Sequence, residues 1–543
     1  MQLCQVSGTA AFVAISLAAT FAFWLGLDDV YRLKHHGEEL RGVSAARVST
    51  VLRHHENAQH GDPTVLRTST ANTAIPAQSP RSPPLTLVGP SVAPHSVLFS
   101  TSIALQSNGS TNAATGLTKP PYFDRGIYNT IHGEKYYDIS RFDGLLPEGN
   151  WTLLLPVLKK LASGGDLKIF VLGGSFTSGV DCLQPAKGTN VSRRLCAWPS
   201  RFLHWLRAAF PRSSVQMENH AQGGSPSNVI LAGLGLLNFA GVDLVLVETL
   251  VNDWGDEVRA YERNSRINKE VAVSASFEVL LRTLKKVAPR SLIYTVEAAC
   301  PGCRLAITNH KKVLEFYKIP HMDMVKVVKD APTLWNGRNH PSYQTHQALA
   351  DLLALSWSNV WDRMAGMNLA NLGPLMQDFG VDFYHPAKER NRFYVCTKPC
   401  AVLSSLHTST VRPKIRRGNW SLYEDRPGKP GWISMTPGSI MEIPLCFGRK
   451  PTLSITFLRS YEKLGRARVT LNHRSITLLG LWNDGSHVSQ SDTIFCRADD
   501  FPGEGGGGGV VGFDVKPNTK STMKIENLKF GNSKMKLISV VSC

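Results

Sequence analysis

Between about residues 150 and 365, apolar runs of strand length alternate with segments that have a helical period. The expected strands are Leu167–Leu172, Val215–Glu218, Asp243–Glu248 and Ser291–Glu297. The expected helices are Leu153–Ala162, Pro199–Phe210, Pro226–Phe239, about 256–288, Ile307–Tyr317 and about Tyr343–Trp361. Strands that are apolar throughout and alternate with helices indicate a parallel sheet covered by helices on both faces.

From about residue 390 the pattern changes to short alternating runs separated by Gly, Asn and Pro. Examples are Leu453–Leu458, Ala467–Leu471 and Ile476–Leu479, and the same pattern continues over Ile525–Val541. No helical stretch of useful length accompanies them. The pattern predicts a β-sandwich over residues 390–543. Such a domain either binds carbohydrate or packs on the first domain as a structural module.

The N-terminal region differs from both. Ala10–Leu27 is an apolar run about long enough to span a bilayer, so residues 1–27 are expected to form a signal anchor or the core of a cleaved signal peptide. No Lys or Arg precedes the run, whereas Arg32 and Lys34 follow it, so the flanking charges by themselves place the N-terminus outside. Residues 28–120 are rich in Ser, Thr, Ala, Pro and Arg without a period, which predicts a disordered stem.

Glycosylation motifs and cysteines favour a single-pass membrane protein with its folded part in the Golgi or ER lumen or outside the cell. The candidate glycosylation sites are Asn108, Asn150, Asn190 and Asn419. The candidate disulfide cysteines are Cys182, Cys196, Cys300, Cys303, Cys396 and Cys400. The chain has 10 cysteines, and with Cys4 in the membrane segment nine remain, so one thiol should be unpaired. Cys300-Pro-Gly-Cys303 fits a structural disulfide or a plain loop better than a redox or zinc site.

The chain is basic, with 60 Lys and Arg against 42 Asp and Glu and a net charge of +18. This balance favours acidic partners such as anionic glycans or phospholipid headgroups. The basic residues are scattered, however, and no nucleic-acid-binding motif is present. We therefore expect a generally basic surface and no nucleic-acid partner.

One strand ends in a way that suggests chemistry. The run Leu167–Leu172 stops at Gly173-Gly174-Ser175, which places a hydroxyl at the carboxyl end of a strand, where open α/β sheets hold their ligands. Alone, this segment also fits an ordinary turn. Three further segments follow in order: Asn219–Gly224, Glu248–Asp253, and His340-Pro341 at the start of a helical pattern.

Together these four segments resemble the four blocks of the SGNH (GDSL-type) esterase and acyl-hydrolase superfamily, over about residues 165–360. The C-terminal part is similar to a module that accompanies such domains in algal-type sequences. The resemblance implies a flavodoxin-like three-layer α/β/α hydrolase domain, here residues 121–370. Two departures stand out, because Gly174 replaces the Asp of Gly-Asp-Ser and Leu250 replaces the glycine of the third block.

The resemblance also assigns roles. Ser175 is implied as nucleophile and His340 as its base. The oxyanion donors are implied to be the backbone N–H of Ser175, that of Gly224 (with Gly223 as the alternative) and the side-chain amide of Asn252. Asp253 is expected to fix its loop rather than to react.

The acid that orients the histidine is missing from its usual place, since Gly337 stands three residues before His340. Asp330, or a backbone carbonyl near Gly337, is a candidate to hold the imidazole instead. Otherwise the site is a Ser-His dyad or a degraded site.

The expected function is a serine esterase acting on an O-acyl ester of a glycan or a lipid, without a metal or organic cofactor. Transfer of the acyl group to a glycan hydroxyl is one alternative. A non-catalytic carbohydrate-binding or protein-binding module is the other. The oligomeric state is not indicated.

Overall fold

The computed structural model describes residues 139–183, 190–253, 269–298, 304–330, 335, 340–365, 367, 376–391, 393–426, 428–482, 488–497, 513–529 and 533–543. The chain divides into two units, Met1–Thr101 and Ser102–Cys543, and all described residues belong to the second. The expected anchor and stem lie outside the described residues. Within the described part, no helix has the length and apolar character needed to cross a bilayer.

A five-stranded parallel sheet forms the first part of the described chain. It consists of β1 (Leu167–Gly173), β2 (Val215–Asn219), β3 (Leu244–Glu248), β4 (Leu292–Glu297) and β5 (His321–Asp323). All neighbouring strands run parallel, in the order β2-β1-β3-β4-β5. This is the flavodoxin-like order, and it confirms the predicted parallel α/β sheet. The sequence did not reveal β5, because three residues are too few to form a pattern.

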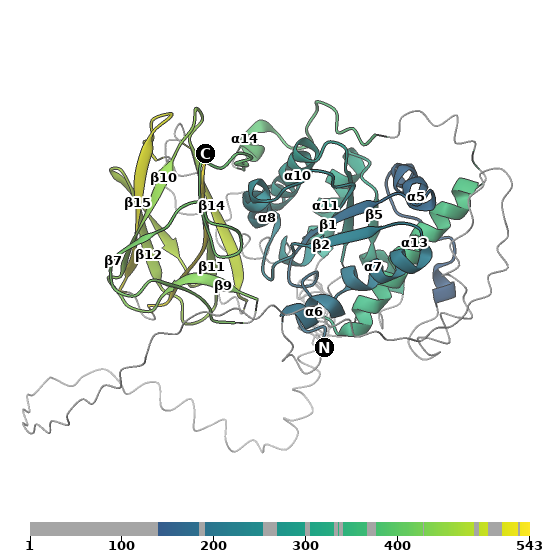
Figure 1. Ribbon diagram of the computed structural model, residues 1–543, viewed down its shortest axis with the longest axis horizontal. Coiled ribbons are helices and arrows are strands. Elements are labelled where there is room, and N and C mark those ends of the chain that lie inside the picture. Colours follow the sequence, from purple (N-terminus) through teal and green to yellow (C-terminus); the bar gives the residue numbers. More distant parts are fainter. Residues whose placement is uncertain are drawn as a thin grey trace, which may run out of the picture. The chain divides into compact units, whose positions relative to one another are not determined.

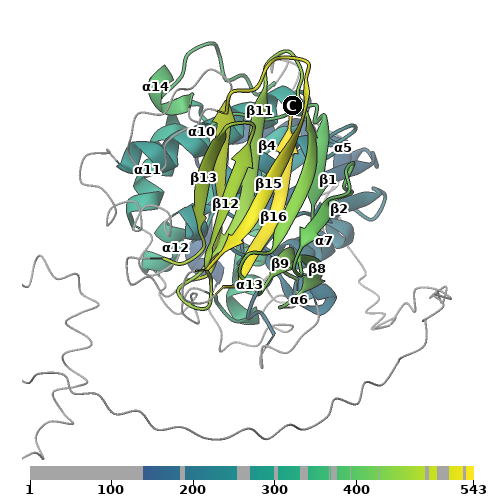
Figure 2. The same ribbon diagram turned by 90° about the vertical axis from the view of Figure 1, so that its left-hand side faces the viewer.

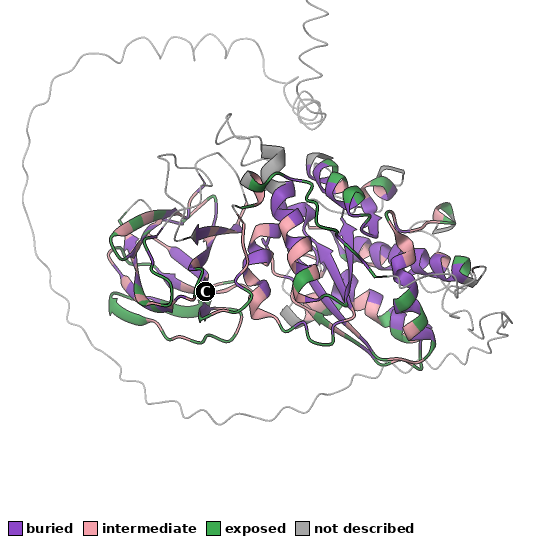
Figure 3. Ribbon diagram, turned by 90° about the horizontal axis from the view of Figure 1, so that it is seen from above, coloured by how far each residue is buried: buried purple, intermediate pink, exposed green. Residues whose placement is uncertain are grey.

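Helices cover both faces of this sheet (Figure 1). Ile169 and Val171 of β1 point into one core, which they share with α5 (Leu155–Ala162), α7 (Trp198–Ala209) and α13 (Tyr343–Ala365). Phe170 and Leu172 point into a second core, with α8 (Ser227–Gly233), α10 (Lys269–Val287) and α11 (Arg304–Phe316). The shorter helices are η2 (Ile139–Phe142), η3 (Trp151–Leu154), α6 (Asn190–Cys196), η4 (Leu234–Leu236), α12 (Met324–Asp330) and α14 (Ala387–Arg390). The central strands are buried from end to end (Figure 3).

The remaining strands form two antiparallel sheets, as predicted. One has the order β13-β12-β15-β10-β7, and the other β14-β11-β16-β9-β8 with β6 also paired to β16. The strands are β6 (Ala401–Ser404), β7 (Lys414–Arg417), β8 (Ser421–Glu424), β9 (Pro430–Ser434), β10 (Ile440–Cys446), β11 (Thr452–Arg459), β12 (Arg466–Leu471), β13 (Arg474–Leu479), β14 (Gln490–Arg497), β15 (Lys520–Leu528) and β16 (Met535–Ser542). Their facing side chains form a separate apolar core. Figure 2 shows the sheet that contains β12 and β15 from its outer side.

The sheet that contains β14 packs on the α/β part. Helix α8 contacts β14 and β11, and Phe495 of β14 belongs to the same core as Leu231 of α8. The backbone carbonyls of Gly224 and Asn252, which follow β2 and β3, also accept hydrogen bonds from the first two residues of β14. The antiparallel domain therefore lies against the carboxyl-end loops that follow β2 and β3.

Candidate active site

Ser175 lies directly beyond the end of β1. It is 5% exposed, and the two glycines before it are required by close packing. A Cβ atom on Gly173 would lie 2.7 Å from Cβ of Thr177, and one on Gly174 would lie 1.7 Å from Oδ1 of Asn252. The amide of Asn252 thus occupies the space that an aspartate side chain would need at position 174. This accounts for Gly-Gly-Ser where the resembled superfamily has Gly-Asp-Ser.

His340 approaches Ser175 from the segment before α13. Its Nε2 lies 2.8 Å from Oγ of Ser175, although the two residues are 165 positions apart in the chain. With the ring proton on Nδ1, Nε2 accepts the hydroxyl proton of Ser175. That is the geometry in which a histidine activates a serine nucleophile.

The carboxylate next to the other ring nitrogen belongs to Asp181. Its Oδ2 lies 3.5 Å from Nδ1 of His340, and the hydrogen bond with His340 holds the pKa of Asp181 below its usual value, although burial opposes this. Both side chains are partly exposed, 45% for Asp181 and 34% for His340, so solvent weakens the pair. The side chain of Asp330, at the end of α12, lies outside the described residues, as does Gly337. Sequence reasoning missed Asp181 because it sought an acid near the histidine, whereas this one follows the serine by six residues.

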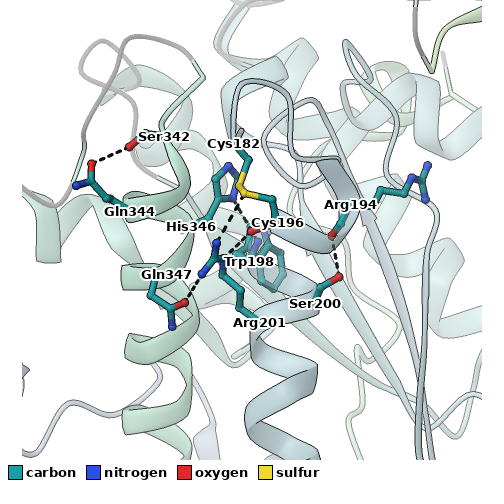
Figure 4. Close-up of a disulfide and its surroundings, with 10 residues drawn as sticks. All are labelled: Cys182, Arg194, Cys196, Trp198, Ser200, Arg201, Ser342, Gln344, His346 and Gln347. Carbon is teal, nitrogen blue, oxygen red and sulfur yellow. Dashed lines mark hydrogen bonds between the residues drawn. A yellow bond between two sulfur atoms is a disulfide. The ribbon is translucent and has the colours of Figure 1, made fainter. Parts of the chain in front are cut away.

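A disulfide fixes the loop that carries Asp181. Cys182, the next residue, is bonded to Cys196 at the end of α6. Arg201 of α7 donates from Nε to the carbonyl of Cys196 at 2.6 Å and from Nη1 to the side chain of Gln347 in α13 (Figure 4). The loop is therefore tied to the helix that follows His340.

A second link joins the same elements. The backbone N–H of Trp198 donates to Nδ1 of His346 at 3.3 Å (Figure 4). The ring of His346 also stacks on Phe176. Burial lowers the pKa of His346 to about 3, so this histidine is neutral and acts as an acceptor in the core. It links Phe176, the residue after Ser175, to the start of α7.

The candidate oxyanion donors gather around Ser175. A Cβ on Gly223 would lie 3.7 Å from Cβ of Ser175, whereas Gly224 has a φ of 80° and its carbonyl accepts from the N–H of Ser491 at 2.8 Å. Gly223 therefore lies next to Ser175, whereas the contacts of Gly224 are with the start of β14, and the two glycines remain alternatives for the donor. Arg194 holds the preceding segment through the carbonyl of Ala221 at 3.0 Å.

Asn252 completes this group, with 8% of its surface exposed and its amide over Gly174. Its backbone carbonyl accepts from Nε2 of Gln490, in β14, at 3.2 Å. Gln490 and Ser491 thus hold the loops of both candidate donors. Sequence reasoning could not find these residues, since nothing in a β-strand pattern indicates which strand will pack on another domain.

Asp253 fixes its loop, as predicted. Its carboxylate accepts from the backbone N–H of Ser227 at 2.7 Å and from the hydroxyl of Ser227 at 2.6 Å, at the start of α8. His310 bridges Asp253 and Glu297 at 3.1 and 2.9 Å. Burial opposes a charge on His310, but the neighbouring carboxylates of Glu297 and Asp253 raise its pKa to about 10.

No family model matches this sequence, and no curated protein matches it. Solved structures do match. A two-domain esterase active on acetylated mannans, co-crystallised with mannopentaose, is 14% identical, with 73% of this chain and 95% of that chain covered and a TM-score of 0.48. The lipase Lip_vut3 from a goat rumen metagenome is 18% identical, covering 38% of this chain and 99% of its own, with a TM-score of 0.29. A family two carbohydrate esterase from Clostridium thermocellum, in complex with cellohexaose, is 14% identical over 36% of this chain and 65% of its own, with a TM-score of 0.27.

The α/β part has an SGNH hydrolase-like fold. Its parallel sheet has the flavodoxin-like order, and the four sequence blocks lie beyond the carboxyl ends of β1, β2 and β3 and before α13. They bring Ser175, His340 and Asn252 to one place. Within the described residues, no group of three or more His, Cys, Asp or Glu side chains is arranged to hold a metal ion.

A second Ser-His-acid group joins α10 to the segment before α14, and it is structural. Oγ of Ser274 lies 2.8 Å from Nε2 of His385, whose Nδ1 lies 2.7 Å from Glu278. All three residues are buried, and Glu278 also accepts the backbone N–H groups of Tyr384 and His385 at 2.7 and 3.0 Å. The group anchors the segment that leads to the antiparallel domain. Ser274 therefore offers a matched control for Ser175.

The candidate disulfides are resolved in part. The described bonds are Cys182–Cys196, Cys396–Cys543 and Cys400–Cys446, so Cys396 and Cys400 have different partners. Cys300 and Cys303 lie outside the described residues. Among the described cysteines, Cys496 is buried and has no disulfide partner. Of the glycosylation candidates, Asn419 is exposed and Asn150 half-buried, whereas Asn108 and the side chain of Asn190 are not described.

Proposed function

We propose that this chain is a serine esterase of the SGNH type that cleaves an O-acyl ester on a carbohydrate. The observation that carries the proposal is the 2.8 Å contact between Oγ of Ser175 and Nε2 of His340 at the carboxyl end of β1. A binding module that has lost catalysis has no need to keep this contact, nor to leave His340 and Asp181 partly exposed to solvent. The roles of nucleophile and base follow from it.

In the first half-reaction Ser175 Oγ attacks the ester carbonyl carbon while His340 Nε2 takes the hydroxyl proton. The oxyanion is stabilised by the N–H of Ser175, the N–H of Gly224 or Gly223, and the amide of Asn252. His340 then gives its proton to the leaving alcohol oxygen, which leaves an acyl group on Ser175. In the second half-reaction a water molecule, deprotonated by His340, releases the acid and restores the serine.

Asp181 acts through His340. An ionised carboxylate near Nδ1 favours the tautomer that leaves Nε2 free to accept the proton, and it stabilises the imidazolium that forms. Because hydrogen bonding with His340 keeps the pKa of Asp181 below its usual value, Asp181 stays ionised at neutral pH. It is a positioning residue in this proposal.

A carbohydrate alcohol is favoured over a lipid by the surroundings of the base. His340 and Asp181 are partly exposed, so a bulky, hydrated alcohol can approach them. A pocket of about 440 Å³ adjoins Cys182, the residue after Asp181, and Leu183, Leu195, Arg201 and Tyr343 also line it. The ring of Tyr343 is 50% exposed and offers a flat face for a sugar ring.

Acetate release from acetylated oligosaccharides tests the proposal. We expect Ser175→Ala and His340→Ala each to remove most of the rate, and the double variant to be little worse than either, because the two side chains act as one unit. Ser274→Ala removes a hydroxyl with the same contact to a histidine and should retain the rate. Equal activity of Ser175→Ala and wild type would refute the assignment, and transfer of acetate to a sugar hydroxyl instead of water would make the chain an acyltransferase.

We also propose that the folded part acts in the secretory pathway or outside the cell, with residues 1–27 as anchor or signal peptide. Disulfides persist in oxidising compartments, which supports this location. Protein from a eukaryotic secretory host should shift in mobility after endoglycosidase treatment. No shift together with fully free thiols would place the domain in the cytosol.

A further inference from the structure

Lys429 brings a positive charge from the antiparallel domain to the candidate active site. It lies between β8 and β9, yet its Cε and Nζ are 3.2 and 3.6 Å from the position of a Cβ on Gly223. The same position is 3.7 Å from Cβ of Ser175. The ammonium of Lys429 and the side chain of Ser175 therefore both lie next to Gly223.

The backbone of Lys429 is held firmly. Its N–H donates to the carbonyl of Arg426 at 2.9 Å, and its own carbonyl accepts from Nζ of Lys536. Lys536 is buried and paired with Asp425, which also binds Lys534 at 2.5 Å. The turn that carries Lys429 is thus tied to β16, which fixes the backbone of Lys429 before a substrate arrives.

The ammonium itself has no such partner. Among the described residues, Nζ of Lys429 makes no hydrogen bond or ion pair, because the nearby Asp425 is engaged by the two other lysines. The charged groups that act on Lys429 are Arg426, Lys536, Asp425 and Arg193, and burial comes first among the causes that lower its pKa. A half-buried ammonium without a partner is costly, so this charge is best explained by an anion that a ligand supplies.

The charge lies beside Gly223, and it is close enough to Asp181 to act on it electrostatically. Lys429 acts electrostatically on Asp181, the residue behind His340, and His340 protonates the leaving oxygen. We infer that Lys429 binds an anionic substituent, a carboxylate or a sulfate, on the sugar that carries the ester. The substrate class is then the acyl ester of an acidic glycan. This inference rests on the proposed esterase function and narrows its substrate.

A matched pair of substrates tests the inference with the full chain. One is an acetylated oligogalacturonide, and the other is the same oligomer with its carboxylates converted to primary amides. We expect kcat/KM for acetate release to be about tenfold higher for the acidic form, since a hydrogen bond between two charged groups is stronger than one with a neutral amide. The preference should shrink as salt is added. An acetylated, sulfated oligosaccharide with its desulfated counterpart separates sulfate from carboxylate as the recognised group.

Three variants assign the preference to one residue. Lys429→Met keeps the apolar stem and should bring the ratio of the two kcat/KM values close to one, whereas Lys429→Arg should keep most of it. Lys516→Met removes an equal charge from an exposed position before β15, in the other antiparallel sheet, and should leave the ratio unchanged. No preference in the wild type, or a preference that survives in Lys429→Met, overturns the inference.

Two neutral readouts keep this result separate from the proposed function. Hydrolysis of 4-nitrophenyl acetate and labelling of Ser175 by a fluorophosphonate report the nucleophile without an anionic group. If Lys429→Met lowers all ester rates equally, its role is not anion binding and the inference fails while the esterase stands. If the wild type is neither labelled nor active, the esterase fails, and the anion site fails with it.

Discussion

Ser175, His340 and Asp181 come from segments that follow β1 and precede α13, and the contacts among them depend on a few short side chains and glycines. Gly174 is one of these, because Asn252 fills the space above it. The departure from the superfamily pattern at position 174 is therefore accommodated by a neighbouring donor rather than being a sign of decay. The missing aspartate before His340 has a similar explanation, since Asp181 supplies a carboxylate from another loop.

The variant Asp181→Asn tests whether Asp181 takes the place of the aspartate that is missing before His340. We expect kcat to fall by about ten- to a hundredfold, less than the 10⁴ seen for a buried triad acid, because the 3.5 Å pair is partly exposed. KM should change little. Steady-state kinetics on 4-nitrophenyl acetate measure the effect, with Asp330→Asn as the matched comparison. A large loss in Asp330→Asn with none in Asp181→Asn would show that the orienting acid is Asp330.

Strand β14 is the element that links the antiparallel domain to catalysis. Its first two residues bind the backbone of Asn252 and Gly224, so the loops of two candidate oxyanion donors rest on it. Donor loops that are held in place cost no reorganisation when the oxyanion forms. The antiparallel domain is in this respect part of the catalytic unit.

Gln490→Ala is expected to lower kcat about tenfold, since Asn252 would keep its amide but lose the bond that fixes its loop. Thr493→Val changes the same strand but removes only a 2.9 Å contact with Thr456 inside the antiparallel domain. It should retain kcat. Comparable rates for Gln490→Ala and wild type would mean that β14 does not support the donor.

Glu248, the last residue of β3, predicts a pH effect on stability. Burial raises its pKa to about 7 from an ordinary 4.5, against the 2.7 Å hydrogen bond from Thr177. Between these values the folded protein holds a proton that the unfolded chain has lost. The stability that this proton provides is full below 4.5 and is lost as the pH rises through 7.

Glu248→Gln should remove this dependence. Relative to wild type, its free energy of unfolding is expected to improve with pH across that window, by up to about 1.4 kcal/mol per pH unit. Urea unfolding at pH values on both sides of the window measures the difference. A difference between the two proteins that stays constant with pH would contradict the raised pKa.

The sequence predicted the elements whose patterns are long. Four strands of the parallel sheet and the helices at 198–209 and 343–365 lie within a few residues of their expected positions, because apolar periodicity determined them. Strands β5 to β10 and β14 were missed. Strand β5 has only three residues, and β7 and β8 are exposed over all four of theirs, so these strands show no alternation of buried and exposed residues. Among the site residues, Ser175 and His340 were found from the block order. Asp181, Gln490 and Lys429 were not, because a disulfide loop and the packing of two domains place them.

At the scale of the whole molecule, two disulfides close loops of very different length. We expect the short one to matter for catalysis and the long one for stability. Cys182–Cys196 closes a separation of 14 residues beside Asp181, whereas Cys396–Cys543 closes one of 147 and ties the segment before β6 to residue 543 after β16. Closing a longer loop restricts the unfolded chain more. The short bond is next to the chemistry, and the long one is remote from Ser175 in the sequence.

The double variant Cys396→Ser/Cys543→Ser should lose about 3–5 kcal/mol of stability while it retains kcat at 25 °C. The double variant Cys182→Ser/Cys196→Ser should show the opposite balance, with a clear fall in kcat because the loop of Asp181 loosens. Thermal unfolding and 4-nitrophenyl acetate kinetics on the same preparations measure both. A loss of kcat in the first variant and not in the second would reverse the assignment.

The most direct measurement of the central claim is the site of covalent labelling by a fluorophosphonate, read by intact mass and peptide mapping. The wild type should take up one phosphonyl group per chain, on Ser175. Ser175→Ala should take up none, and His340→Ala should react far more slowly. Ser274→Ala should behave as wild type, because it leaves Ser175 and His340 unchanged. Labelling that persists in Ser175→Ala, or its absence in the folded wild type, would show that Ser175 is not an activated nucleophile.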